Sequence, residues 1–461
     1  MKNKILVLIL AALLGTTAAF AQKQTPPEGS APKDFVLPPS TTFSLDNGLH
    51  ATLIPYGSLP KVTVRAVVRV GNLNETANEV WLCDLLGDLM KEGTTTRSAK
   101  QLALEAAKLG GNISITTGAD QTLIEGSVLS EFAPKMVELI ADLIRHPAFP
   151  ESELQRLKND RIRQLSIDKT DPTQIALERF RAVMFPDHPY GRLQPTEKML
   201  GGYKMDQLRD FYATNYGAVR THVYVAGKFD DKSTEEAIRK QFGDWAHGPE
   251  PLINIPKPVS QRAIYIVDRP GASQSTVFLG LPTIDPSNPD YRALIVTNSL
   301  LGGSFGSRIT ANIREDKGYT YSPNSSLSSR YRNAYWTQYA SLTTDVTGPA
   351  LKEIFYEINR LQKEAPGEAE LKGIQNYLAG VFVLQNSSPA GIINQLSFLN
   401  LHGLPKSYLT EYVKTVYAIT PEQVRQMTEK YLRPDEMLIV IAGDKKKVEK
   451  QVTTFGKLAQ R

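Results

Sequence analysis

The sequence has a single cysteine, Cys83, in 461 residues. No disulfide can form within the chain, so core packing must hold the fold, and we expect Cys83 to be a small buried apolar residue. The six histidines are scattered: no two are four residues apart, the spacing that puts two imidazoles on one helix face. Neither sign of charge is in large excess: the formal net charge is only +5, and Lys2 and Lys4 contribute two of these charges. This balance gives no case for nucleic acid or a strongly anionic partner.

The first 40 residues have a different composition from the rest. Lys2 and Lys4 precede an apolar run over 5–20, which ends at Ala19-Phe20-Ala21. This pattern predicts a signal peptide over 1–21, with an uncleaved anchor as the alternative. Residues 22–40, rich in Pro, Gly and Ser, are expected to form a flexible lead-in. With no second membrane segment in the sequence, we expect an exported protein, either periplasmic or fully secreted, that leaves the membrane after signal cleavage.

The remaining chain repeats itself at a spacing near 215 residues. Leu85-Leu86-Gly87-Asp88 recurs as Leu300-Leu301-Gly302-Gly303, and Val223-Tyr224-Val225-Ala226-Gly227 recurs within Leu438–Gly443. A period of this length is too long for a solenoid and indicates two similar domains. We therefore predict an N-terminal domain over 41–246, a Pro- and Gly-rich linker over 247–261 and a C-terminal domain over 262–461.

Each half reads as a mixture of strands and helices. A hairpin is expected around Asn47-Gly48, a helix from about 80 to 92, and a second helix from Ser98, as its cap, to Gly110-Gly111. The run Thr221 to Ala226 is apolar enough for a central strand. The predicted fold class is α+β, with two homologous two-layer domains, each an antiparallel-rich sheet covered by helices on one side.

The helix over 81–91 has two distinct faces. At 100° per residue, Trp81, Leu85 and Leu89 lie on the apolar side. Asp84 and Asp88 stack on the polar side at i, i+4. Their plainest interpretation is a solvated face on which Lys91 pairs with Asp88.

Residues 80–97, VWLCDLLGDLMKEGTTTR, resemble the signature helix of the pitrilysin/insulinase family of zinc peptidases, the inverzincins. In that family the helix carries H-x-x-E-H and a Gly-Thr step follows, here Gly93-Thr94. The resemblance places Asp84 and Asp88 at the two histidine positions and Gly87 at the position of the general base. Counting back from Asp171-Pro172 places Gln164 at the distal glutamate ligand.

These replacements remove the family's chemistry. Two carboxylates and an amide form a hard, weak site that prefers Mg²⁺ or Ca²⁺ to Zn²⁺. Gly87 has no group that can accept a proton. We therefore expect this chain to bind no metal itself, with zinc held by a partner subunit. An enzyme that uses another cation on Asp84 and Asp88 is a further alternative.

The second half contains SLLGGSFGSRITANIREDKGYTY over 299–321. This segment resembles the family's other signature, in which an Arg and a Tyr seven residues later contact the substrate backbone; here they are Arg314 and Tyr321. Guanidinium and phenol donors suit a developing oxyanion. From the residues alone, Arg314 could instead pair with Glu315 or Asp316, and Tyr321 could be a strand residue half in the core.

The resemblance spans about 43–455 and is most specific to heterodimers in which one subunit binds zinc and its sister carries the Arg-Tyr pair. It implies a clam-like half chamber, a partner with H-x-x-E-H and unfolded peptide as substrate. The expected function is a non-catalytic, substrate-binding subunit of a zinc endopeptidase. A scaffold or peptide-binding protein that never joins an active site is the alternative.

Overall fold

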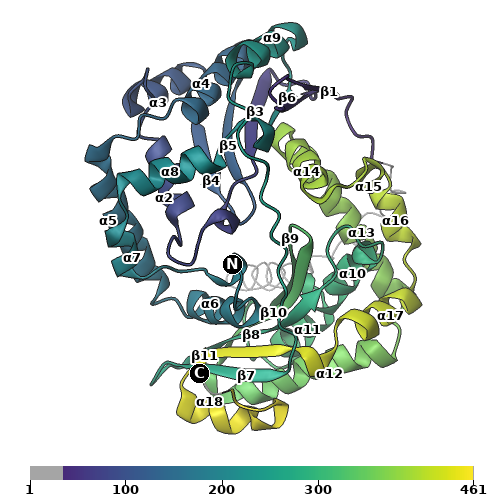
Figure 1. Ribbon diagram of the computed structural model, residues 1–461. Helices are drawn as coiled ribbons and strands as arrows, with labels where there is room; N and C mark the ends of the chain where they lie inside the picture. Colours follow the sequence, from purple (N-terminus) through teal and green to yellow (C-terminus); the bar gives the residue numbers. More distant parts are fainter. Residues whose placement is uncertain (1–34, 460–461) are drawn as a thin grey trace, which may run out of the picture. The chain divides into compact units, whose positions relative to one another are not determined.

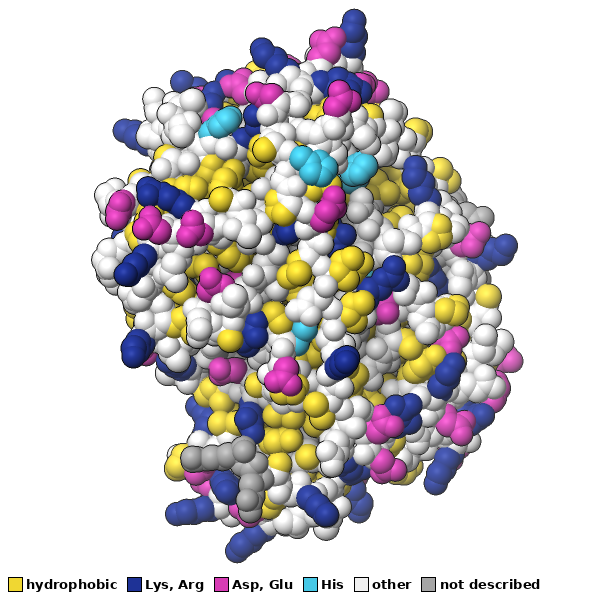
Figure 2. Space-filling view, in the orientation of Figure 1, with side chains coloured by type: hydrophobic (Ala, Val, Ile, Leu, Met, Phe, Trp, Pro, Cys, Tyr) yellow, Lys and Arg dark blue, Asp and Glu magenta, His cyan; other side chains and the backbone are white. Residues whose placement is uncertain are grey.

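The computed structural model describes residues 35–459, so the predicted signal peptide and most of the lead-in lie outside the described residues. Among the described helices, none is both long and apolar enough to span a membrane. On the face seen in Figure 2, basic and acidic side chains are interspersed, as the small net charge suggests.

Within the described residues, the first half contains a six-stranded sheet of order β1-β2-β6-β3-β5-β4 (Figure 1). Its neighbouring strands are antiparallel except β2 and β6, which are parallel. The predicted hairpin is confirmed: Gly48 has φ +87°, a conformation that favours glycine, and Phe43 pairs with Ala51. The strands are β1 (Thr41–Ser44), β2 (His50–Pro55), β3 (Lys61–Val68), β4 (Ile113–Thr117), β5 (Thr122–Leu129) and β6 (Thr221–Gly227).

Helices of the first half begin where the sequence offers a cap or a proline. The Ser98 hydroxyl accepts the backbone N–H of Gln101 at 3.3 Å and starts α3, as predicted. Pro150 precedes α5, and Asp171 caps α6 by accepting the N–H of Thr173 at 2.7 Å. The helices are α2 (Leu82–Met90), α3 (Ala99–Lys108), α4 (Ala133–Arg145), α5 (Glu151–Asp168), α6 (Pro172–Met184), α7 (Glu197–Gly202), α8 (Met205–Asn215) and α9 (Asp231–Phe242).

The second half contains, among the described residues, a five-stranded sheet of order β7-β11-β8-β10-β9. Its strands are β7 (Ala263–Asp268), β8 (Gln274–Thr283), β9 (Asn324–Arg330), β10 (Asn333–Thr343) and β11 (Leu438–Gly443). Its helices are α10 (Tyr291–Asn298), α11 (Arg308–Thr310), α12 (Thr347–Lys363), α13 (Glu368–Gln385), α14 (Pro389–His402), α15 (Ser407–Thr410), α16 (Tyr412–Ala418), α17 (Pro421–Tyr431) and α18 (Lys445–Val452). Two π-helical turns, 299–303 and 311–316, extend α10 and α11.

The two sheets repeat one plan, which confirms the predicted duplication. Strands β7, β11, β8, β10 and β9 occupy the places of β2, β6, β3, β5 and β4, and β7 and β11 form the parallel pair that matches β2 and β6. Helices α5 and α13, each of 18 residues, begin 217 positions apart, at Glu151 and Glu368. The fold class is therefore α+β with two homologous domains, as predicted.

The covering of each sheet differs from the expected single helical side. Alternate residues of β2, β3 and β6 point to two faces. One face packs on helices of its own half, whereas Ile54, Val67 and Tyr224 pack on Phe382 and Ile392 of α13 and α14. Reciprocally, Phe180 and Met184 of α6 pack on the outward face of β8 and β11 (Figure 1). The halves thus exchange the helices that follow α5 and α13, and the central strands of each sheet are buried on both faces.

No helix or strand is described between Phe242 and Ala263, the region where the linker is predicted. Pro249 and Glu250 in this stretch receive hydrogen bonds from Arg220 at 2.9 and 2.6 Å through their carbonyl groups. The exact domain limits remain a prediction.

Candidate functional site

Helix α2 is amphipathic, as predicted, and its apolar side lies in the core of the first half. Leu82, Leu85 and Leu89 are fully buried, and so is Cys83, in agreement with its expected role. Asp84 and Asp88 lie on the other side, with side chains 20% and 23% exposed. Both carboxylates therefore sit at the edge of the solvent rather than in open water.

An arginine occupies the space between these two carboxylates. Arg161 of α5 donates from Nε to Asp88 Oδ2 at 2.6 Å and from Nη2 to the Asp84 carbonyl oxygen at 3.0 Å. Its Nη1 lies 3.6 Å from Asp84 Oδ1. Lys91 also pairs with Asp88, at 3.0 Å, as the sequence predicted. The polar face of α2 is thus neutralised by the protein's own cations.

Gln164, expected at the distal ligand position, points elsewhere. Its amide donates to Asp168 Oδ1 at 2.8 Å, and in the described part of the chain it has no hydrogen bond to Asp84 or Asp88. Gly87 is buried, and a Cβ there would meet Thr117 Oγ1 at 3.1 Å. The structure therefore brings together Asp84, Asp88 and Gly87, but not Gln164.

The sequence interpretation missed Arg161 and Glu75, and it placed Trp81 within the helix rather than at its start. Trp81 begins α2 with φ +68°, a strained conformation for such a residue, and its ring lies 6.0 Å from the Arg161 guanidinium. Arg161 follows Leu157 and precedes Leu165 on the buried stripe of α5, at i, i+4 spacing. A charged residue within an apolar helical stripe is the signal that would have found it.

Glu75 caps α2 from the preceding loop. It is 5% exposed and accepts the backbone N–H groups of Cys83 at 2.9 Å and Trp81 at 3.2 Å. Asn72 links it to Asp84, donating to Glu75 Oε1 at 3.2 Å and to Asp84 Oδ2 at 2.8 Å. Burial raises the pKa of Glu75 to about 8. Burial also raises the pKa of Asp84, although Arg161 and the Asn72 hydrogen bond oppose the rise.

This donor set does not fit zinc. In the described residues no cluster of three or more His, Cys, Asp or Glu side chains could hold a metal ion. A divalent cation on Asp84 and Asp88 would have to share their carboxylates with the guanidinium of Arg161, which is a like charge. The same clash weighs against the alternative of Mg²⁺ or Ca²⁺ at this place.

The Gly93-Thr94 step has a structural role in this fold. Gly93 has φ +128°, and a Cβ would meet the Arg97 carbonyl oxygen at 2.9 Å. Thr94 Oγ1 donates to Asp142 of α4 at 2.7 Å, and Arg97 binds the same carboxylate at 2.7 Å. The step closes α2 and fastens it to α4.

Arg314 and Tyr321 lie together in the second half. The Arg314 guanidinium is 5.1 Å from the Tyr321 ring centre and 4.3 Å from that of Phe305. Its one ion pair among the described residues is with Glu315, at 3.3 Å, so this part of the alternative considered for Arg314 is confirmed. Tyr321 is 81% exposed, so it is not the half-buried strand residue considered as an alternative.

The loop that carries Tyr321 is fixed by the residues that immediately precede Tyr321. Gly318 has φ +65°, and the Tyr319 N–H donates to the Ile313 carbonyl at 2.8 Å. Thr320 Oγ1 donates to the Ser341 carbonyl on β10 at 2.7 Å. The exposed Tyr321 hydroxyl therefore lies beside the 23% exposed Arg314 side chain, and together they offer hydrogen-bond donors that suit carbonyl oxygens.

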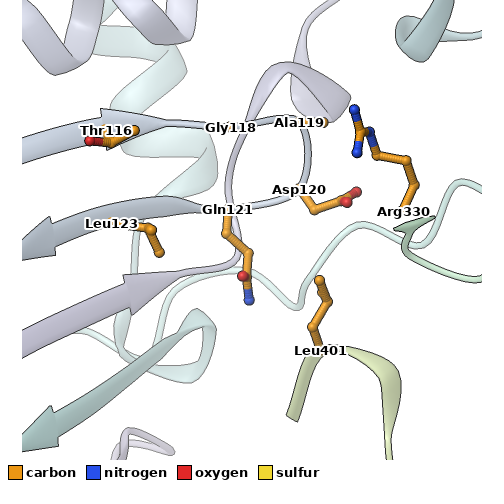
Figure 3. A pocket seen from close by; sticks show the side chains of 8 residues that line it. All are labelled: Thr116, Gly118, Ala119, Asp120, Gln121, Leu123, Arg330 and Leu401. Atoms are coloured by element: carbon orange, nitrogen blue, oxygen red, sulfur yellow. The ribbon is translucent and has the colours of Figure 1, made fainter. Parts of the chain in front are cut away.

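A separate pocket of about 370 Å³ lies where the β4–β5 turn meets Arg330 of β9 and Leu401 of α14. Figure 3 shows the side chains of Asp120, Gln121 and Arg330 converging on it. Asp120 accepts the Tyr190 hydroxyl and, at 3.3 Å, the Tyr331 N–H. The bond to Tyr331 joins the β4–β5 turn to the β9–β10 turn of the other half, and the bond to Tyr190 stays within the first half, so Asp120 acts as a structural junction.

Two domain families that match this chain belong to one peptidase family. The Insulinase (Peptidase family M16) domain matches residues 55–193, and the Peptidase M16 inactive domain matches residues 203–378. A zinc protease of Bacillus subtilis, YmxG, is 23% identical over 87% of this chain and 97% of its own length. A zinc protease of Rickettsia felis is 25% identical over 71% of this chain and 79% of its own length.

Solved structures agree with these matches. The peptidase M16 inactive domain from Pseudomonas fluorescens superposes with a TM-score of 0.80 at 25% identity, over 88% of this chain and 98% of that one. A protease from Helicobacter pylori gives a TM-score of 0.82 at 19% identity, over 88% of this chain and 100% of that one. The second likeness supports the fold alone.

Proposed function

Since this chain belongs to the M16 (insulinase) peptidase family, we propose that it is the non-catalytic, substrate-binding subunit of an exported zinc endopeptidase. The observation that carries the proposal is Arg161, whose guanidinium lies between Asp84 and Asp88 where the resemblance places the histidines of an active relative. A chain with its own cation at that place does not activate water there. Its contribution to hydrolysis must come from another surface.

Arg314 and Tyr321 supply that surface. The Arg314 guanidinium on the 311–316 helical turn and the Tyr321 phenol on the following loop can hold the backbone carbonyls of an extended peptide and stabilise negative charge on the carbonyl oxygen under attack. The partner in this proposal is an M16 subunit with an intact H-x-x-E-H helix. Zinc in such a partner supplies the activated water. The substrate is an unfolded peptide, because only an extended backbone exposes its carbonyl groups to both subunits.

Mixing tests the proposal directly. The purified chain alone should not cleave fluorescently labelled, unfolded casein, and chelator should make no difference. Addition of an H-x-x-E-H M16 protein from the same organism should give chelator-sensitive turnover. Chelator-sensitive cleavage by the chain alone would overturn the non-catalytic assignment.

Substitution then separates the proposed subunit from an inert scaffold. In the reconstituted pair, Arg314→Ala with Tyr321→Phe should lower kcat/KM by about 100-fold, typical of lost oxyanion donors. A matched control is Arg209→Ala with Tyr356→Phe, since both side chains are exposed and distant in sequence. Unchanged turnover in the first double variant would favour the scaffold.

Export is part of the proposal and has its own test. The mature protein is expected to begin at Gln22, which N-terminal sequencing of protein from the culture or the periplasm would check. An N-terminus that still carries residues 1–21 would indicate the anchor instead.

A further inference from the structure

A groove beside the Arg314–Tyr321 pair has no assigned role. It lies between the 304–306 loop and the first half of α13 and has a volume of about 370 Å³. Its walls are mainly apolar and come from Leu300, Phe305, Gly373, Ile374 and Tyr377. Phe305 and Tyr377 are 72% and 48% exposed, which is unusual for large aromatic side chains on a free surface. We call this feature the Phe305–Tyr377 groove.

The walls of the groove are held in place by a buried arginine. Arg308, whose side chain is 10% exposed, binds Glu370 of α13 through two parallel hydrogen bonds of 2.7 and 2.8 Å. This bidentate pair neutralises the one charged residue that lines the groove. The groove is therefore preformed, apolar and uncharged.

The duplicated helix in the first half shows that this apolar surface is not required by the fold. Helix α5 holds the equivalent position, and its segment 156–168 carries Arg156, Lys158, Asp160, Arg161, Arg163 and Asp168. The matching segment of α13, residues 373–385, contains no charged residue. On α13, Gly373, Tyr377, Gly380 and Leu384 are exposed. Where α5 carries charged residues, α13 exposes glycine and apolar residues. Such a surface is typical of one that another molecule contacts.

The groove adjoins the hydrogen-bond donors of the second half. Phe305 forms one wall, and its ring packs 4.3 Å from the Arg314 guanidinium, which in turn lies beside Tyr321. Among the described residues, the guanidinium has one ion-pair partner, the 57% exposed side chain of Glu315, so it can attract the carbonyl oxygens of an incoming backbone. Donors for a backbone and an apolar recess for a side chain thus stand next to each other.

We propose that the Phe305–Tyr377 groove receives one large apolar or aromatic side chain of an unfolded peptide whose backbone is held by Arg314 and Tyr321. This inference rests on the proposed function and adds a side-chain preference to it. The groove volume is at the lower end of the roughly 300–1,000 Å³ of ligand pockets, which suits a single side chain with its flanking backbone. Its lack of free charge disfavours acidic and basic side chains, since they would lose solvation without gaining a partner.

A glycine in the groove provides a clean test. Gly373 lies inside α13, and no described atom is within 4 Å of an added Cβ. Gly373→Leu fills the groove and should favour the helix, because leucine is a better helix former than glycine. Gly380→Leu is the matched control: it lies two turns along the same face, is equally open and does not line the groove.

The measurement is fluorescence anisotropy with the full chain and short fluorescein-labelled Gly/Ser peptides that carry one central Phe or, for comparison, Ala. The wild type and Gly380→Leu should bind the Phe peptide about tenfold more tightly than the Ala peptide, as expected for burial of one aromatic side chain. Gly373→Leu should bind the two peptides within about twofold of each other.

The outcomes distinguish this inference from the function on which it rests. If both peptides bind the wild type equally, or if Gly373→Leu keeps the full Phe preference, the groove assignment is wrong while peptide binding stands. If the wild type binds neither peptide, the peptide-binding function itself fails. Circular dichroism of both leucine variants checks that α13 remains folded.

Discussion

Replacement of Arg161 by methionine removes the cation between Asp84 and Asp88 and keeps most of the side-chain volume. An exposed ion pair contributes about 0–1 kcal/mol, whereas loss of one partner of a buried pair costs about 3–5 kcal/mol. The three side chains are 20–23% exposed, which lies between these limits. We therefore expect Arg161→Met to lower the free energy of unfolding by about 2 kcal/mol at pH 7.

Urea unfolding followed by tryptophan fluorescence is a suitable assay, since Trp81 lies beside the substituted residue. In a thermal scan the same loss corresponds to a shift of about 2 °C, because the two halves unfold together and the unfolding entropy is about 2.1 cal/mol/K per residue over the described residues 35–459. The deficit should shrink toward acid pH, because protonation of Asp84, whose pKa is raised by burial, removes part of the uncompensated charge.

Two further variants make this prediction specific. Arg163→Met, on the same helix but 71% exposed, should cost less than about 0.5 kcal/mol. Addition of Asp84→Asn and Asp88→Asn to Arg161→Met should recover about half of the loss or more, because the only charge that then loses its partner at this place in the described residues is the exposed Lys91. If Arg161→Met is no less stable than Arg163→Met, the guanidinium does not balance the two carboxylates and the reasoning fails.

The remaining predictions concern metal and pH. After dialysis against zinc and desalting, the chain should retain far less than one equivalent by atomic spectrometry, and a stable full equivalent would contradict the proposed loss of the metal site. Glu75 has a folded pKa of about 8, above its unfolded value near 4.5, so its contribution to stability is complete below about pH 4.5 and is lost as the pH rises through 8. Glu75→Gln should reduce this fall in the free energy of unfolding, which is at most about 1.4 kcal/mol per pH unit. Urea unfolding of the wild type and the variant at pH 5, 6.5 and 8 measures the fall. If the free energy of unfolding changes with pH equally in the two proteins, the prediction is wrong.

Local chemistry accounts for the parts of the fold that the sequence predicted. The Asn47-Gly48 turn needs a positive φ, which glycine provides, and the Ser98 hydroxyl satisfies an N–H that the first turn of α3 leaves free. Such features depend on residues within three or four positions of each other. The duplication was visible for a related reason, since corresponding strands keep similar apolar runs.

Contacts between distant residues were not predicted. Arg161 donates a hydrogen bond to the backbone of Asp84, 77 positions away in the sequence. On α5 it lies nearly one turn before Gln164, the residue that counting back from Asp171-Pro172 had identified. The apolar residues of α6 and α14 predict that each helix is buried, but not which sheet covers it. The candidate pair Arg314 and Tyr321 was identified by resemblance, whereas the Phe305 ring that packs on Arg314 came from the structure alone.

Because α6 and α14 each pack on the sheet of the other half, the stability of each half depends on the other. If a protease cut the 247–261 stretch, the fragments would remain associated, since each keeps a helix seated on its neighbour's sheet. Either fragment made by itself would display a bare apolar sheet face and an unseated helix, the conditions under which chains aggregate. The two duplicated halves are therefore expected to unfold as one cooperative unit, so that a substitution that destabilises one half also destabilises the other.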